Sequence, residues 1–247
     1  MRLVIGNFYP ELLNLYGDRG NTECLVRRCQ WRSIEVEVRF LGLETDPSVV
    51  SECDLLFAGG GPDLAQVRVA QDWPRFQDAL QDFADRKGVG LFICGAYQLL
   101  GHYYRPAKGD DLPGLGLLDI TTQHFGKDKP RCIGNVVVEL GASSRKLLDK
   151  PLVGFENHGG RTYLGEGVQP LGRVKKGYGN NGEDKTEGAV YKNIIGTYLH
   201  GPLLPKNPHL ADYLIIKALA PRYGDVQLSK LDDSLEWEAH QRALRLR

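Results

Sequence analysis

The stretch at residues 88–101, GVGLFICGAYQLLG, decides the fold and holds the first candidate for catalysis. Residues 90–93 form a short apolar run typical of a buried parallel strand, and the run ends abruptly at Cys94. Two small residues follow, Gly95 and Ala96, and then a segment with helix-forming character. A strand that ends on a nucleophile and turns sharply into a helix is a nucleophile elbow, whose tightness requires small neighbours.

Cys94 has two interpretations at this point. At the start of a helix, the helix dipole and free backbone N–H groups favour the thiolate, which is the form that attacks. Alternatively, Cys94 is a structural core residue, because free cysteines are among the most buried residue types. This stretch alone leaves both interpretations open.

Composition narrows the class of protein. The 247 residues, 42% of them hydrophobic, can bury a sizeable core, and we interpret residues 1–247 as a single domain. Lys plus Arg and Asp plus Glu both number 31, so no net charge favours nucleic acid or an anionic membrane. No apolar run approaches the roughly 20 residues of a membrane span, and no signal-peptide pattern opens the sequence. We therefore expect a cytoplasmic protein without a membrane span.

The cysteines argue against two kinds of site. They are odd in number and form no C-x-x-C pair, at positions Cys24, Cys29, Cys53, Cys94 and Cys132. This pattern disfavours a disulfide framework and a structural zinc site, so no metal site is expected.

The first half alternates strands and helices. Strands are predicted at residues 3–5, 34–41 and 54–58, ahead of the strand that ends at Cys94. Asn21 or Thr22 is expected to cap a helix that runs to about residue 33. A second helix is expected from apolar residues at helical spacing: Trp73, Phe76, Leu80 and Phe83. This order predicts an α/β fold with a doubly wound, mostly parallel sheet flanked by helices.

Loops that follow the parallel strands are expected to share one crevice. They contain residues 17–18, residues 59–61 and Cys94, because the carboxyl ends of parallel strands meet at one edge of the sheet. The triple glycine at 59–61 fits a turn with positive φ. It equally fits a loop that brings a bare backbone N–H to a developing oxyanion. A phosphate-binding role is disfavoured, because neither standard glycine-rich phosphate motif is present.

The second half has shorter strands, which we interpret as a continuation of the same domain. They are predicted at residues 117–122, 135–140, 153–156, 172–175, 189–191 and 194–198. His200 ends the last of these, just before a loop that contains Pro202. A lone histidine is more often structural, but His200 resembles Cys94 in its place at a strand's end, and Cys–His catalysis needs a base with a pKa near 7.

Together these motifs resemble the class I (triad-type) glutamine amidotransferases, in their cobyric-acid-synthase-like branch. The resemblance rests on FAGGG at 57–61, ICGAYQ at 93–98, GFENHGGRT at 154–162 and YLHGP at 198–202. Within the branch, three segments are most similar to glutaminase subunits of lipid II isoglutaminyl synthases: LNLYGDRGN at 13–21, YGNNGEDK at 178–185 and GTYLHGPLLPKN at 196–207. The resemblance covers nearly the whole chain and implies a flavodoxin-like fold.

The resemblance also implies roles at the reacting bond. Cys94 would attack the side-chain amide of glutamine, and His200 would serve as its general base. Gly60 and the N–H of Gly95 would lie near the oxyanion. Ala96 departs from the glycine usual in these elbows, although alanine fits a tight turn where its φ is negative.

The resemblance also implies two substrate contacts, but it does not identify the third catalytic group. The resemblance makes Arg131 the contact to the substrate carboxylate and gives Gln98 a part in holding the amino-acid end. The family usually carries a glutamate two residues after the histidine, but this sequence has Pro202 there. Asp18, Glu156 or a residue of a partner chain remain as candidates for orienting the histidine.

The implied function is that of a glutaminase subunit. It would hydrolyse L-glutamine to glutamate and pass ammonia to a Mur-ligase-like, ATP-dependent synthetase subunit in a heterodimer. That partner would amidate the D-glutamate α-carboxyl of the lipid II stem peptide during peptidoglycan synthesis. No cofactor is expected on this chain, with ATP and Mg²⁺ expected on the partner. Two alternatives are an amidotransferase for cobyrinic acid or another carboxylate, and a non-catalytic binding protein on the same scaffold.

Overall fold

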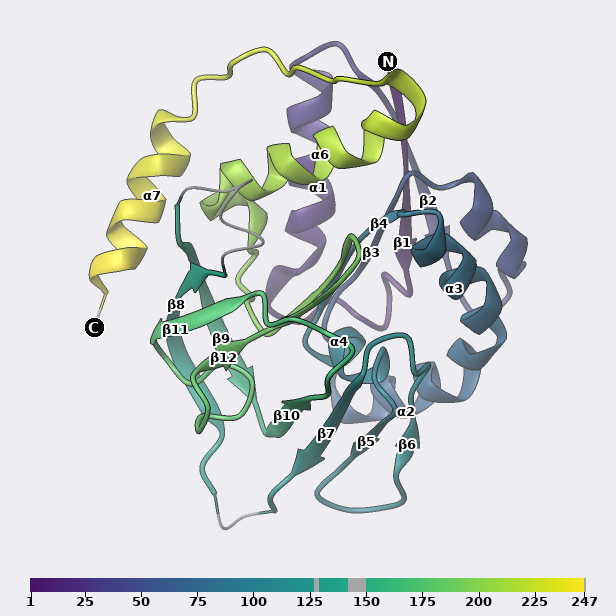
Figure 1. The fold of residues 1–247 in the computed structure, drawn as a ribbon, viewed down its shortest axis with the longest axis vertical. Coiled ribbons are helices and arrows are strands. Elements are labelled where there is room, and N and C mark those ends of the chain that lie inside the picture. Colours follow the sequence, from purple (N-terminus) through teal and green to yellow (C-terminus); the bar gives the residue numbers. More distant parts are fainter. Residues whose placement is uncertain (127–128, 142–149, 247) are drawn as a thin grey trace.

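The computed structural model describes residues 1–126, 129–141 and 150–246 and is built around a six-stranded sheet (Figure 1). The strand order is β13-β14-β4-β3-β1-β2. Only β13 runs antiparallel to its neighbour. The bounds are β1 Arg2–Phe8, β2 Glu35–Leu41, β3 Leu55–Ala58, β4 Val89–Ile93, β13 Ala189–Tyr191 and β14 Ile194–Thr197. The predicted doubly wound, mostly parallel sheet is confirmed, and the order β2-β1-β3-β4-β14 is the flavodoxin-like one.

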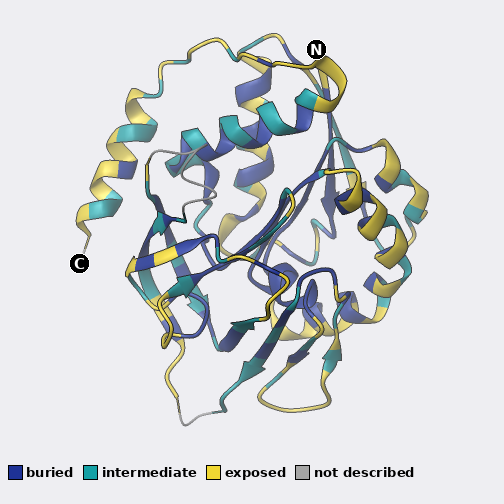
Figure 2. Ribbon diagram, viewed as in Figure 1, coloured by how far each residue is buried: buried dark blue, intermediate teal, exposed yellow. Residues whose placement is uncertain are grey.

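Helices cover both faces of this sheet. On one side lie α1 (Arg19–Gln30) and α6 (Pro208–Tyr223), and on the other lies α3 (Gln77–Asp85) (Figure 1). Aromatic rings join the α3 side to the sheet, with the centroids of Phe8 and Trp73 5.7 Å apart. The central strands are buried, whereas the outer faces of the helices are exposed (Figure 2). Within the described residues, no helix is both long enough and apolar enough to cross a membrane.

The predicted start of the first helix is wrong. The helix α1 begins at Arg19, so Asn21 and Thr22 lie inside its first turn instead of capping it. The side chain of Asn21 accepts a hydrogen bond from the backbone N–H of Leu204 at 2.8 Å, and Asn14 accepts from the N–H of Arg19 at 2.9 Å. The side-chain oxygen of Asn21, which was expected to cap the helix, therefore binds the backbone of Leu204 instead.

The predicted helix through the aromatic residues is interrupted. Trp73–Phe76 form a 3₁₀ turn, η3, between α2 (Asp63–Asp72) and α3. Pro74 explains the break, because proline lacks the N–H that a continuous α-helix requires and its ring crowds the preceding turn. The spacing of the apolar residues thus indicated the correct buried face but not the helix boundaries.

In the second half, β13 and β14 extend the main sheet, and the other strands form two further four-stranded sheets with β5 and β6. One sheet has the order β12-β11-β8-β9 and the other β10-β7-β5-β6. The bounds are β5 Tyr103–Arg105, β6 Leu112–Pro113, β7 Ile120–His124, β8 Cys132–Leu140, β9 Leu152–His158, β10 Gly160–Leu164, β11 Gly172–Lys176 and β12 Thr186–Glu187. Each strand predicted in this half overlaps an observed one, but β10, which begins within the GFENHGGRT motif at 154–162, was not predicted. The helix α7 (Ser234–Arg245) comes last along the chain.

Candidate active site

Four loops meet at the carboxyl edge of the main sheet, the three that the sequence predicted and the loop after β14. They follow the parallel strands β1, β3, β4 and β14 and carry Asp18, Gly60, Cys94 and His200. This edge includes the point where the strand order reverses, between β1 and β3, which is the usual ligand position in such sheets.

Cys94 occupies a sharp turn between β4 and the short helix α4 (Gly95–Leu99). Its backbone has φ 52° and ψ −106°, a conformation that strains a non-glycine residue by about 1–3 kcal/mol. Its N–H donates to the carbonyl of Thr197 at 2.8 Å, which ties the turn to β14. This is the elbow geometry that the sequence indicated. Because α4 spans only five residues, its dipole is a weaker support for a thiolate than a neighbouring cation.

His200 provides that neighbouring group, and its backbone is fixed by a strand from another sheet. His200 and Phe155 of β9 exchange two backbone hydrogen bonds, at 2.7 and 3.2 Å. Its side chain is fully buried, and Nδ1 lies 3.2 Å from the carboxylate of Asp18. Asp18 therefore occupies the position from which a carboxylate orients a catalytic imidazole and selects the tautomer that carries its proton on Nδ1.

Cys94 is the other close titratable neighbour of the His200 ring. Burial, the largest single influence, lowers the pKa of His200, but the negative charges of Cys94 and Asp18 and their hydrogen bonds outweigh it. The pKa of His200 is raised to about 10. Among the described residues Nε2 of His200 has no hydrogen-bond partner, so it is free to give or take a proton at the reacting bond.

Gly60 approaches the reacting groups so closely that no side chain fits there. A Cβ on this residue would lie 2.8 Å from Cε1 of His200 and 3.1 Å from Cβ of Cys94. The N–H of Gly60, however, donates to Asp18 at 2.7 Å. The structure therefore places Gly60 beside the nucleophile, with its amide engaged. The N–H of Gly95 lies in the first turn of α4, where amides have no acceptor within their own helix.

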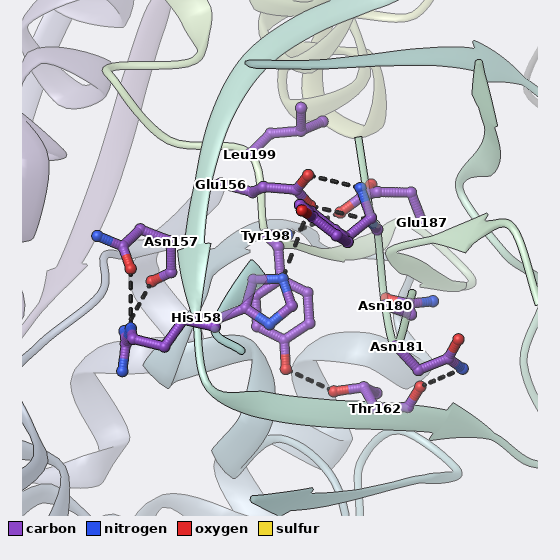
Figure 3. Close-up of polar contacts among 12 residues, drawn as sticks. Glu156, Asn157, His158, Thr162, Asn180, Asn181, Glu187, Tyr198 and Leu199 are labelled. Atoms are coloured by element: carbon purple, nitrogen blue, oxygen red, sulfur yellow. Dashed lines mark hydrogen bonds and ion pairs between the residues drawn. The ribbon is translucent and has the colours of Figure 1, made fainter. Parts of the chain in front are cut away.

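Asp18 and Glu156, the two in-chain candidates for the third member, lie in different surroundings. Glu156 is buried away from His200, and its carboxylate accepts the backbone N–H groups of Tyr178 at 2.6 Å and Gly179 at 2.8 Å (Figure 3). Its role here is to fix the turn after β11. Of the two, the structure brings Asp18 to the histidine and not Glu156.

Pro202, which stands where the family usually has glutamate, packs against the start of α1. A Cβ on Gly20 would meet the Pro202 ring at 2.8 Å, so glycine permits this close approach. Gly20 is two residues from Asp18. Pro202, which replaces the usual glutamate, thus packs against the segment that contains Asp18.

The two predicted substrate contacts differ in exposure. Arg131 is exposed, and its Nε and a terminal NH₂ group donate to the side-chain and backbone oxygens of Asn157 at 3.0 and 3.2 Å. Gln98 is buried on α4, where its amide nitrogen donates to the hydroxyl of Tyr198 at 3.1 Å. Its oxygen has no partner within the described residues, which leaves one acceptor free for a ligand.

Sequence reasoning missed three residues around the site. Tyr16 places its ring edge-on to His200, with the centroids 5.1 Å apart. Asn157 joins Tyr16 to Arg131. Gln66 lies on α2 so close to the elbow that a Cβ on Gly95 would come within 2.5 Å of its amide nitrogen. Tyr16 and Asn157 lie inside motifs that were recognised, but only the tertiary structure shows what they contact.

A buried polar cluster supports β9 and β14 behind the site (Figure 3). The ring of His158 stacks on Tyr198 with centroids 3.6 Å apart. The hydroxyl of Tyr198 lies 2.6 Å from that of Thr162. Glu187 accepts the N–H of Tyr198 at 2.8 Å, and burial, as the largest cause, raises its pKa to about 7.

The other cysteines differ from Cys94 in their surroundings. All five are free. Burial, the largest cause in each case, raises the pKa values of Cys24, Cys29 and Cys53 to about 12. Cys132 is fully buried. Across the described parts of the chain, no three His, Cys, Asp or Glu side chains are grouped as metal ligands.

Comparisons with known proteins agree with this geometry. Residues 4–208 match the CobB/CobQ-like glutamine amidotransferase domain. The chain is 41% identical to the glutamine-hydrolysing subunit GatD of lipid II isoglutaminyl synthase from Staphylococcus aureus, over 97% of this chain and 93% of that protein. It is 38% identical to the corresponding Streptococcus pneumoniae subunit, over 96% and 88%.

Similarity of fold extends further than similarity of sequence. The structure of PurLQS from Thermotoga maritima superposes with a TM-score of 0.58 at 13% identity, covering 99% of this chain and 100% of that one. At that identity the match concerns the fold alone. The domain match, the full-length relatives and the elbow at the carboxyl edge of the sheet lead to one conclusion: the chain belongs to the CobB/CobQ-like family of glutamine amidotransferases.

Proposed function

We propose that this protein is a glutaminase subunit that hydrolyses L-glutamine to glutamate and ammonia. The observation that carries the proposal is the convergence of Cys94, His200 and Asp18 at the carboxyl edge of the sheet, with the Asp18 carboxylate 3.2 Å from Nδ1 of His200. This arrangement suits nucleophilic acyl transfer.

In the first half of the reaction, the Cys94 thiolate attacks the side-chain carbonyl carbon of glutamine. The carbon–nitrogen bond of the tetrahedral intermediate then breaks as Nε2 of His200 gives its proton to the leaving nitrogen, which departs as ammonia. Asp18 holds Nδ1 and stabilises the imidazolium that donates this proton. The N–H of Gly95 is the donor best placed for the oxyanion, and Gly60 can contribute once its amide is released from Asp18.

In the second half, water hydrolyses the glutamyl thioester. His200, now neutral, takes a proton from the water as it attacks, and the sulfur leaves as a thiolate again. Arg131 would hold the substrate α-carboxylate throughout, because its guanidinium is exposed, is connected to His200 through Asn157 and Tyr16, and keeps N–H groups beyond those that bind Asn157. Gln98 would offer its free oxygen to the amino-acid end.

We further propose that the ammonia serves a Mur-ligase-like, ATP-dependent synthetase subunit that amidates the D-glutamate α-carboxyl of the lipid II stem peptide. The support is the near-complete alignment with the S. aureus and S. pneumoniae subunits. ATP and Mg²⁺ would bind that partner, and this chain would need no cofactor of its own. Both subunits would work in the cytoplasm, where ATP is available.

The test is an assay of glutamate release, performed with the chain alone, with its co-purified synthetase, and with synthetase, ATP and acceptor. We expect slow release by the chain alone and faster release in the complete assembly, with Cys94→Ser inactive in all three. Cys94→Ser that retains full glutaminase activity would overturn the proposal, and so would a wild-type complex that releases no glutamate. Activity with cobyrinic acid, and none with lipid II, would replace the acceptor while leaving the glutaminase reaction intact.

A further inference from the structure

The loop that supplies Asp18 also supports His200 from a second side. Tyr16 belongs to the 3₁₀ turn η1 (Leu15–Gly17), two residues before Asp18, and its ring meets the imidazole edge-on at 5.1 Å and 72°. Asp18 holds Nδ1 of the imidazole, and the Tyr16 ring limits how far the imidazole can turn about that contact.

Tyr16 is held in a backbone conformation that tyrosine rarely adopts. Its φ of 54° and ψ of 24° lie in the left-handed region, which is costly for a bulky side chain. The turn is anchored by the N–H of Leu15, which donates to the carbonyl of Gly60 at 2.9 Å. The ring is anchored by its hydroxyl, which accepts the side-chain N–H of Asn157 at 2.5 Å. Strain of this kind persists only where surrounding contacts maintain it.

Asn157 uses the other end of the same amide for Arg131. Its side-chain oxygen accepts from Nε of Arg131 at 3.0 Å, and its backbone oxygen accepts from a terminal NH₂ group at 3.2 Å. One side chain thus bridges the exposed guanidinium proposed for the substrate carboxylate and the ring that confines the catalytic imidazole. Figure 3 shows Asn157 at the end of β9, beside His158 and its stack with Tyr198.

We infer that Asn157 and Tyr16 are positioning residues that couple substrate binding at Arg131 to the orientation of His200. This inference rests on the proposed glutaminase function. A carboxylate bound to Arg131 fixes the guanidinium, the guanidinium fixes the amide of Asn157, and the amide holds the Tyr16 ring against the imidazole. This chain of contacts can change the rate of hydrolysis although neither Asn157 nor Tyr16 touches the reacting bond.

The test is a double-mutant cycle on glutamine hydrolysis, with kcat and KM measured separately for the full chain in complex with its co-purified synthetase. Tyr16→Phe removes the hydroxyl and keeps the ring, so kcat should fall about 3- to 10-fold, the usual effect of one hydrogen bond, with little change in KM. Asn157→Ala should lower kcat by a similar factor and also raise KM about 10-fold, because Arg131 loses its support. The double variant should be no slower than Asn157→Ala alone.

Two further variants separate positioning from general damage. Asn157→Asp keeps an acceptor for Arg131 and lets the Tyr16 hydroxyl donate instead, so kcat should stay near wild type. KM should rise, because the new carboxylate competes with the substrate for the guanidinium. Tyr223→Phe is a matched control: its exposure is 40% against 42% for Tyr16, and its hydroxyl likewise accepts one hydrogen bond, from the N–H of Arg2. This control should leave both constants unchanged.

The results distinguish a failure of the proposed coupling between Asn157 and Tyr16 from a failure of the glutaminase function. If the wild-type complex hydrolyses glutamine but the losses in Tyr16→Phe and Asn157→Ala multiply in the double variant, the link between the two residues is wrong and the glutaminase function stands. The link is also wrong if Asn157→Asp loses kcat with an unchanged KM. If the wild-type complex shows no hydrolysis, the proposed function fails and this inference fails with it.

Discussion

The carboxylate of Asp18 lies 3.2 Å from Nδ1 of His200, although 182 residues separate the two in the sequence. The same carboxylate accepts the N–H of Gly60 at 2.7 Å. Asp18 therefore joins the loops after β1, β3 and β14. An imidazole held at Nδ1 in this way leaves Nε2 for Cys94. The chain therefore carries its orienting carboxylate on the loop after β1, whereas the family usually carries a glutamate two residues beyond the histidine.

We expect Asp18→Asn to lower kcat for glutamine hydrolysis about 10²- to 10⁴-fold, because the amide cannot stabilise the imidazolium and favours the wrong tautomer. Glu156→Gln is the comparison variant, since Glu156 binds the backbone of Tyr178 and Gly179 and not the histidine. It should lower the thermal stability and change kcat only a few-fold. If Asp18→Asn keeps full activity both alone and with the synthetase, the orienting carboxylate comes from elsewhere, such as the partner chain.

The raised pKa of His200 predicts the alkaline limit of the reaction. Its value of about 10 means that the imidazolium persists through neutral pH, and kcat/KM should fall as pH rises through about 10, where the proton for the leaving ammonia is lost. Since the folded-state pKa lies above the ordinary 6.5, the contribution to stability is complete below pH about 6.5 and is lost as pH rises through about 10. In Asp18→Asn this limit should move to lower pH. A limit at the same pH in both proteins would mean that Asp18 does not interact with the imidazolium.

Arg131 should govern substrate affinity. Arg131→Ala should lower kcat/KM for glutamine about 10- to 100-fold, as expected for the loss of a charge-assisted contact worth roughly 1.5–3 kcal/mol. Arg131→Lys should recover only part of it, because an ammonium cannot bind a carboxylate in the same two-pronged way. Steady-state kinetics measure both variants. An unchanged kcat/KM in Arg131→Ala would assign this arginine to the surface or to an interface.

Glu187 should make the fold less stable as pH rises from about 4.5 to about 7. Its pKa is raised from 4.5 to about 7, so the folded chain binds the proton more tightly than the unfolded chain does. Stability should therefore be greatest below pH about 4.5 and decline as pH rises through about 7, by up to about 3 kcal/mol. Glu187→Gln should remove this decline, measured by denaturant unfolding at pH 4.5 and pH 6.5, a range in which the contribution of His200 stays complete. Glu238→Gln, a change at a solvent-exposed ion pair, serves as the control. The same decline in Glu187→Gln as in wild type would show that another group titrates.

Local chemistry made much of the fold predictable. The apolar run before Cys94, the small residues after it and the alternation of strands with helices are properties of neighbouring residues, and they predicted the parallel sheet, the elbow and the shared crevice. His200 was predictable as a titratable residue at the end of an apolar strand. These features are indicated by neighbouring residues within one element or by the order of the elements along the chain.

The remaining features depend on contacts between distant segments. Asn21 has the side chain of a helix cap, but a backbone amide of Leu204 takes its oxygen, and α1 starts earlier. Asp18 and Glu156 were indistinguishable in sequence, because each is a single carboxylate in a polar stretch. The pairing of Phe155 with His200 brings β9 to the site, and no hydrophobic periodicity in the sequence predicts this pairing. Tyr16 and Asn157 were visible as members of motifs, but their contact joins residues 141 positions apart.

The most direct test of the account is the site and rate of modification by an electrophilic glutamine analogue such as 6-diazo-5-oxo-L-norleucine. The account predicts one adduct per chain, on Cys94, formed far more slowly in Asp18→Asn and in His200→Ala. The other cysteines should not react, because burial raises the pKa values of Cys24, Cys29 and Cys53 to about 12 and Cys132 is fully buried. Mass spectrometry of the intact chain and of its peptides measures both quantities. Adducts spread over several cysteines, or modification of Cys94 at an equal rate in all three proteins, would contradict the claim that His200 and Asp18 activate Cys94.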